Sequence, residues 1–249
     1  MDNKKTNRSR IGEAGNVLFL ILIAVALFAA LSYAVTQSTR TGGGSGDNET
    51  ALISSAQLTQ YPASIRTAVV RMIIGGTDVG DLEFNTPTDF GNCTGTGTPA
   101  GEQFCVFHPN GGGATYATAP GDMMANTGGN LAGIWTFNAE NQIDLAGTST
   151  GNDDPLAPTA DIIAFLPGIT LSLCQRINQE LDVGVIEIET GIDLVTQKIN
   201  GVTICDGGCT AGATIGTGGV AVHTLDGQPF GCFQQPAGRY HYYHVLVER

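Results

Sequence analysis

The sequence predicts an α+β protein: an N-terminal transmembrane helix, then an ectodomain in which an amphipathic helix packs on an antiparallel β-sheet with long, disulfide-pinned loops. Three observations predict this arrangement. Residues 17–35 form one apolar stretch without a charged side chain. Residues 47–74 have helical periodicity, and the rest of the chain alternates short β-rich runs with glycine-rich turns. All six cysteines follow the apolar stretch, as is typical of an exported domain.

The apolar stretch, residues 17–35, reads VLFLILIAVALFAALSYAV. As a helix it spans about 28 Å, close to the roughly 30 Å hydrocarbon core of a bilayer. Five of the 11 basic residues lie in the first 40 residues, against two of the 23 acidic residues. The positive-inside rule therefore predicts a single-pass inner-membrane protein with a cytoplasmic N-terminus and a periplasmic or extracellular domain. A plain anchor and a signal peptide cleaved near Ser32-Tyr33-Ala34 are alternative interpretations.

The junction before the apolar stretch reads RIGEAGN over residues 10–16, so a basic leader ends in a glycine and an apolar helix begins at once. This layout resembles the N-terminal signal of type IV pilins and type II secretion pseudopilins. The resemblance implies that a prepilin peptidase cuts between Gly15 and Asn16 and that the apolar helix stays on the mature chain. It also implies that other pilin-like subunits are the partners. Five residues after the cut that family usually has Glu, where this chain has Leu20.

The domain boundaries follow from composition. Residues 1–15 form a basic cytoplasmic leader and residues 16–40 the transmembrane helix. Residues 41–46, TGGGSG, form a flexible linker, because clustered glycines are expected to break a helix. Residues 47–249 form the extracytoplasmic α+β domain.

Two amphipathic helices are expected in this domain. In residues 47–74, large apolar side chains recur at steps of three and four and form one stripe. The stripe consists of Leu58, Tyr61, Ile65, Val69 and Met72. Pro62 is expected to kink or restart the helix, and Gly75-Gly76 to end it. The second helix covers about residues 171–181.

Short β-rich runs between turn residues predict the antiparallel sheet. Residues 81–84 alternate acidic and apolar side chains. The other candidate strands are residues 104–107, 134–137, 142–145, 183–188, 194–199, 202–205, 220–225 and 239–247.

The cysteines are expected to form disulfides, and six of them allow fifteen pairings. They are Cys93, Cys105, Cys174, Cys205, Cys209 and Cys232. We expect Cys93–Cys105 to close a loop and the remaining four to form two bridges, for which Cys174–Cys232 is a candidate pair. The spacing of Cys205 and Cys209 also fits half of a zinc site, although an oxidising compartment favours disulfides.

No catalytic, cofactor-binding or metal site is predicted. The sequence has no nucleophile–base arrangement and no phosphate-binding loop, and its net charge of −12 is unsuited to nucleic acid. His241 and His244 lie three residues apart in an expected strand, where they point to opposite faces. The acidic residues 151–154 lack the ligand spacing of an EF-hand loop.

The expected function is therefore structural and without catalysis: a minor pilin or pseudopilin-like subunit of a type IV pilus or type II secretion-type filament. The alternative is a membrane-anchored binding module that recognises a glycan, peptide or surface partner. Its long loops and Tyr240, Tyr242 and Tyr243 would supply the contacts.

Overall fold

The computed structural model describes residues 13–93, 101–125, 133–139, 141–147, 160–192, 194, 213–216 and 225–249. The chain divides into two compact units, Met1–Thr50 and Ala51–Arg249. The predicted strand at 202–205 lies outside the described residues, as do most of those at 194–199 and 220–225.

The first element is α1, one helix over Glu13–Ile74. It continues through residues 41–46, where the sequence predicts a break. Glycine in a helix interior costs only about 1 kcal/mol relative to alanine, so it destabilises a helix without forbidding it. Pro62 likewise lies inside α1 without ending it.

The predicted transmembrane helix over residues 16–40 is wrong. Within the described part of the chain, no helix combines the length and the apolar character that crossing a membrane requires. The prediction of a single-pass inner-membrane protein with a cytoplasmic N-terminus is corrected with it.

The predicted antiparallel sheet is present in the unit Ala51–Arg249. Within the described residues it has four strands in the order β1-β3-β6-β5, and each neighbouring pair is antiparallel. Their bounds are Thr136–Asn138 for β1, Ile162–Ile169 for β3, Tyr240–Val247 for β6 and Phe230–Gln234 for β5. A second, parallel pair consists of β2, Gln142–Ile143, and β4, Thr214–Ile215.

Some predicted strands are irregular or short helical segments instead. The run 104–107 makes only an isolated bridge at Cys105, to Glu83, and 183–188 only one at Ile188, to Gln234. Among the residues described between α1 and β1 are four short 3₁₀ helices: η1 over Val79–Asp81, η2 over Pro87–Asn92, η3 over Gly101–Phe104 and η4 over Gly121–Met123.

The central pair of the sheet, β3 and β6, is buried on both faces. Its register runs from Ile162 opposite Val247 to Ile169 opposite Tyr240. Successive side chains alternate between two apolar cores, as the period of a strand requires. The first core includes Ala164, Leu166, Tyr242 and Leu246, and the second includes Ile163, Phe165, Tyr243 and Val245.

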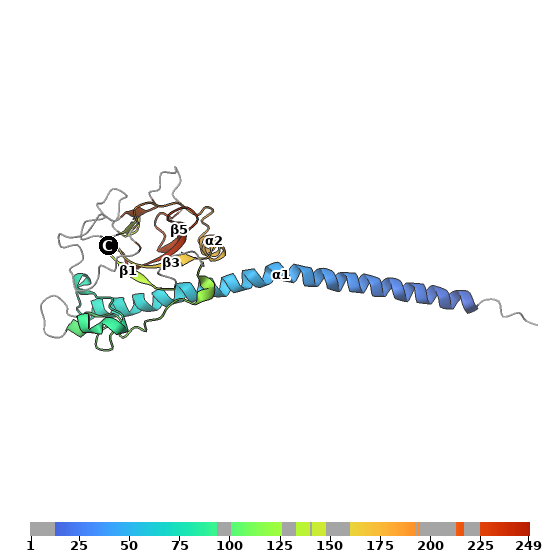
Figure 1. The fold of residues 1–249 in the computed structure, drawn as a ribbon, viewed down its shortest axis with the longest axis horizontal. Coiled ribbons are helices and arrows are strands. Elements are labelled where there is room, and N and C mark those ends of the chain that lie inside the picture. Colours follow the sequence, from blue (N-terminus) through green and yellow to red (C-terminus); the bar gives the residue numbers. More distant parts are fainter. Residues whose placement is uncertain are drawn as a thin grey trace, which may run out of the picture. The chain divides into compact units, whose positions relative to one another are not determined.

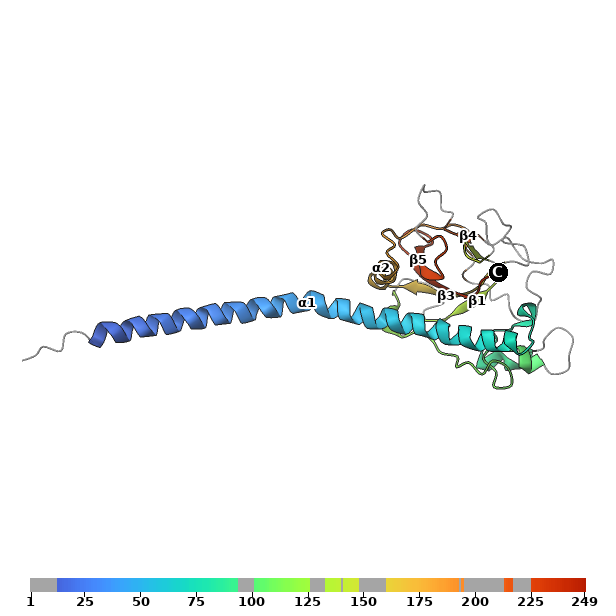
Figure 2. The ribbon, with the colours of Figure 1, turned by 180° about the vertical axis from the view of Figure 1, so that it is seen from behind.

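The C-terminal part of α1 covers the first core. Leu58, Ile65 and Val69 are fully buried there, which confirms the predicted stripe. The Tyr61 ring lies 5.1 Å from that of Trp135, next to β1. Figures 1 and 2 show this part of α1, in cyan, alongside the sheet from both sides. The second core lies between the sheet and the β2–β4 pair.

The second helix, α2, covers Leu171–Glu180, close to the predicted range. Thr170 caps it by accepting a hydrogen bond from the Leu173 N–H. Leu173, Cys174 and Ile177 are buried, and the Cys174–Cys232 disulfide joins this helix to β5.

The outer edge of β5 is covered rather than open. The buried Asn178 side chain accepts a hydrogen bond from the Cys232 N–H and donates one to the Cys232 carbonyl, both at 2.9 Å. Two residues further along, the Gln234 N–H donates to the Glu187 carbonyl and the Gln234 carbonyl accepts from the Glu189 N–H. A side-chain amide and one short segment thus take the place of a fifth strand.

We expect Asn178→Leu to lower the free energy of unfolding by about 2–4 kcal/mol, because it leaves a buried N–H and a buried carbonyl of β5 without partners. Urea unfolding followed by the fluorescence of Trp135, the single tryptophan, measures this. The matched control is Gln179→Leu, an exposed position of the same helix, where the change should stay within about 0.5 kcal/mol. Equal effects of the two substitutions would contradict the assignment.

Two buried titratable groups oppose each other in their effect on stability. Burial raises the pKa of Asp161 to about 6, although the Ile143 and Arg249 N–H groups donate to its carboxylate and act in the other direction. Burial, and then the Arg66 charge, lower the pKa of His244 to about 4. The folded state therefore binds the Asp161 proton more tightly, and the His244 proton less tightly, than the unfolded state does.

This difference in proton affinity between the folded and unfolded states sets the sign of each pH dependence of stability. Between about pH 4 and 6 the Asp161 contribution to the unfolding free energy falls as pH rises, and between about pH 4 and 6.5 the His244 contribution rises. Each changes by about 3 kcal/mol. Asp161→Asn should therefore steepen the rise of stability with pH, and His244→Gln should flatten or reverse it. Urea midpoints at steps between pH 4 and 7 test this, and two slopes like that of the wild type would refute it.

Candidate interaction surface

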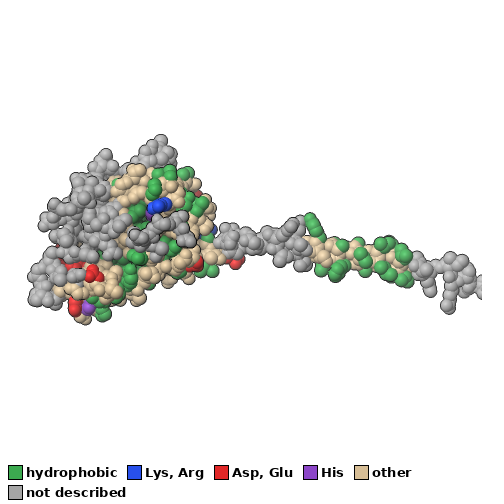
Figure 3. Space-filling view, in the orientation of Figure 1, with side chains coloured by type: hydrophobic (Ala, Val, Ile, Leu, Met, Phe, Trp, Pro, Cys, Tyr) green, Lys and Arg blue, Asp and Glu red, His purple; other side chains and the backbone are tan. Residues whose placement is uncertain are grey.

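The largest exposed apolar surface among the described residues lies on α1 at residues 17–33. Twelve large apolar side chains are exposed there, from 40% at Ile23 to 73% at Phe28. They are Val17, Leu18, Phe19, Leu20, Ile21, Leu22, Ile23, Val25, Leu27, Phe28, Leu31 and Tyr33. No charged residue interrupts the stretch, and Figure 3 shows green side chains without red or blue ones along it. We call these residues the apolar helix surface.

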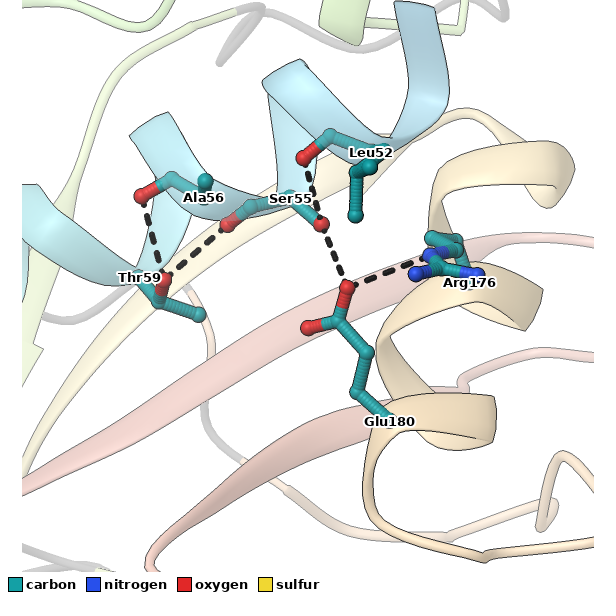
Figure 4. A network of polar contacts seen from close by, with 6 residues as sticks. All are labelled: Leu52, Ser55, Ala56, Thr59, Arg176 and Glu180. Carbon is teal, nitrogen blue, oxygen red and sulfur yellow. Dashed lines mark hydrogen bonds and ion pairs between the residues drawn. The ribbon is translucent and has the colours of Figure 1, made fainter. Parts of the chain in front are cut away.

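Burial of α1 begins further along the chain, at Ser54 and Ser55. The Ser55 hydroxyl donates to Glu180 Oε1 at 2.8 Å, and the Arg176 Nε donates to the same oxygen at 3.2 Å (Figure 4). Ser55 Oγ also contacts the Leu52 carbonyl at 2.9 Å. One carboxylate at the C-terminal end of α2 therefore fixes α1 where its buried stripe starts.

The predicted processing junction, Gly15 and Asn16, lies in the first turn of α1. Both residues precede the apolar helix surface directly. Cleavage between them stays a prediction.

Both disulfides that the sequence analysis favoured are present. Cys93 is bonded to Cys105 and Cys174 to Cys232. Each typically contributes about 2–4 kcal/mol to stability by restricting the unfolded chain. The remaining candidates, Cys205 and Cys209, lie outside the described residues.

Of the three tyrosines expected to contact a ligand, Tyr240 is partly buried and packs against the first core, and the other two are core residues. Tyr242 and Tyr243 are fully buried, and burial raises the pKa of both hydroxyls well above the usual value. The Tyr242 hydroxyl is hydrogen-bonded to His244 Nδ1 at 2.9 Å, and the Tyr243 hydroxyl donates to the Gln228 carbonyl. Neither ring is available to a glycan or a peptide.

His241 and His244 are engaged by the protein itself. His241 Nε2 lies 2.6 Å from the Gln235 carbonyl oxygen, and the His244 ring stacks on Phe230. The acidic residues 151–154 lie outside the described residues. Among the described residues, one group of potential metal-ligating side chains was not predicted from the sequence: Glu83 lies beside Cys93 and Cys105, which form a disulfide.

Comparison of the chain with protein families, with curated proteins and with solved structures finds no match. Its function is therefore argued from its own residues.

A double-mutant cycle tests the connection between α1 and α2. We expect Ser55→Ala and Glu180→Ala each to lower the free energy of unfolding, and the double variant to lose about 1 kcal/mol less than the sum, because both remove the same hydrogen bond. Thr59→Ala is the control, since the Thr59 hydroxyl contacts only carbonyls of its own helix. Strict additivity of Ser55→Ala and Glu180→Ala would show that this bond contributes nothing.

Proposed function

We propose that this chain is a structural subunit, without catalytic activity, of a filament of the type IV pilus or type II secretion pseudopilus kind. The observation that carries the proposal is the apolar helix surface at residues 17–33. A helix that is apolar on all sides is stable only when other apolar groups cover it. In this proposal the covering groups are the same helices of neighbouring subunits.

The size of the apolar helix surface supports association. Burial of a large apolar side chain contributes about 1.5–3 kcal/mol, so twelve half-exposed side chains supply on the order of 10 kcal/mol or more. The cost of losing translational and rotational freedom on association is about 4–15 kcal/mol. Contacts with several neighbours, as in a helical bundle, therefore provide enough free energy for a stable assembly.

The continuity of α1 supports a role for the helix as the link between assembly and domain. The helix that carries residues 17–33 also supplies Leu58, Ile65 and Val69 to the core of the unit Ala51–Arg249. A subunit held through the apolar helix surface therefore carries its domain with it, and the disulfides keep that domain folded outside a reducing compartment.

The N-terminal residues support the pilin-like character of the proposed filament. Gly15 and Asn16 separate a basic leader from the apolar helix, as in the signal that a prepilin peptidase cuts. In the proposal, this peptidase removes residues 1–15, so that Asn16 begins the mature helix. Leu20, one of the twelve side chains of the apolar helix surface, stands where the family usually has Glu.

We expect Leu22→Asp to abolish filaments, because assembly would bury a carboxylate without a partner. Leu22 is 60% exposed, so the substitution leaves the core of the domain intact. The matched control is Ile53→Asp, which places the same charge at a similarly exposed position of α1 outside residues 17–33. Sedimentation and electron microscopy of fibres from cells that express each variant measure assembly, and Trp135 fluorescence checks the fold.

The intact mass of the wild-type chain, isolated from wild-type fibres, is also measured. It should correspond to a chain that begins at Asn16. Fibres of Leu22→Asp equal to those of the wild type would overturn the proposal. So would a wild-type chain that forms no fibres and still begins at Met1.

A further inference from the structure

A second feature of the domain brings three metal-ligating atoms together. A Glu83 carboxylate oxygen, Cys93 Sγ and Cys105 Sγ lie within 4.8 Å of one another, and the described residues contain no other group of this kind. Glu83 Oε2 is 3.3 Å from Cys105 Sγ. The Cα atoms of Cys93 and Cys105 are 5.9 Å apart.

The backbone holds this group in place. The Glu83 N–H donates to the Phe104 carbonyl at 2.9 Å, and the Val106 N–H donates to the Glu83 carbonyl at 2.8 Å. These two bonds flank Cys105 and set it opposite Glu83 as an isolated parallel bridge. The carboxylate and the sulfur therefore face each other as a consequence of the fold and not of a flexible side chain.

The group is also buried. Glu83 is only 2% exposed, and Cys93 and Cys105 are buried with it. Its chain neighbours Leu82 and Phe84 are buried apolar residues.

We propose that the reduced chain binds a divalent zinc-type cation through Glu83, Cys93 and Cys105, and that this cation and the Cys93–Cys105 disulfide exclude each other. Thiolates and a carboxylate are ligands that zinc accepts, and three protein ligands leave a fourth position for water. Zinc–sulfur bonds of about 2.3 Å require two separate thiolates, which a disulfide cannot supply.

Conversion of the disulfide form into the cation-bound form requires a two-electron reductant. A dithiol reductant gives two electrons and two protons to the Cys93–Cys105 bond, which breaks into two thiols while the reductant becomes a disulfide. The cation then displaces both thiol protons, which pass to solvent, and binds the two thiolates and the Glu83 carboxylate. In the reverse direction a disulfide oxidant accepts two electrons from the two thiolates and takes up two protons from solvent to become a dithiol, while the Cys93–Cys105 bond forms again and the cation is released.

The consequence is a loop that is closed in both redox states. In the oxidised chain the disulfide connects residues 93 and 105, and in the reduced chain the cation connects the same two residues. A newly made chain in a reducing compartment would thus hold these sulfurs in place, and shielded from other thiols, until the disulfide forms. This inference does not depend on the proposed filament.

Cobalt(II) binding to the full chain tests the site, because tetrahedral cobalt with thiolate ligands has intense visible and near-ultraviolet absorption. The chain is reduced with a phosphine and titrated with Co²⁺, and Zn²⁺ is then added to displace it. We expect one Co²⁺ per reduced chain and none per oxidised chain. Glu83→Gln should weaken binding at least about tenfold, and Cys93→Ser should do the same.

Two controls separate this site from other ligands. Glu102→Gln changes a half-exposed acid close to Cys105 in the sequence, and Cys205→Ser with Cys209→Ser removes the pair that has zinc-like spacing. Both should leave Co²⁺ binding unchanged. Should reduction unfold the chain, Zn²⁺ should raise the melting temperature of the reduced wild type and not that of Glu83→Gln, since binding free energy then appears as folding free energy. Reduced wild-type chain without Co²⁺ binding, or Glu83→Gln with wild-type affinity, would overturn the proposal.

Discussion

The pairing of β3 with β6 is the interaction on which the rest of the domain depends. It joins residues 162–169 to residues 240–247 and gives the sheet two apolar faces. The stripe of α1 packs on one of these faces and the β2–β4 pair on the other, while β1 and β5 add to the two sides. Because the pair closes a long stretch of chain, its loss of conformational entropy has to be offset by burial on both faces at once. This explains why nearly every side chain of the two strands is buried.

How much of this fold the sequence predicts depends on how many faces an element buries. The stripe of α1 and the helix α2 bury one face each, so their helical period is visible in the sequence. β3 buries both faces and therefore shows a continuous apolar run without alternation. It also contains Pro167, which argues against a central strand, and the structure accommodates this proline next to a register shift at Gly168, whose φ is +84°. The sequence pattern therefore does not reveal β3, and with it the longest strand pairing of the sheet, that of β3 with β6.

The same reasoning applies to the candidate sites. The apolar helix surface is plain in the sequence because it is a continuous apolar run, although no helix among the described residues meets the requirements of the membrane span that this run predicted. Glu83 cannot be recognised from the sequence as a metal-ligating residue. It is one of two acids in the run 81–84, and alternation of acidic and apolar residues is typical of a strand with one solvated face. Only the bridge to Cys105 shows that its carboxylate is buried against sulfur. Tyr242 and Tyr243 show the opposite error, because they were predicted to contact a ligand and are buried in the core. A run of aromatic residues is compatible with either location.

The hydrogen bonds of Asn178 affect how closely copies of the domain can be brought together without aggregation. An uncovered edge strand is a template for any other strand, and pairing of such edges leads to irregular aggregates. Its side-chain amide saturates the Cys232 backbone, and Glu187 and Glu189 saturate that of Gln234, so the hydrogen-bonding groups of β5 at these positions are already used within one molecule. Copies of the domain can therefore be concentrated without this edge joining neighbouring sheets. Contacts between side chains then determine the spacing of the copies. Such contacts depend on the sequence, whereas backbone pairing does not.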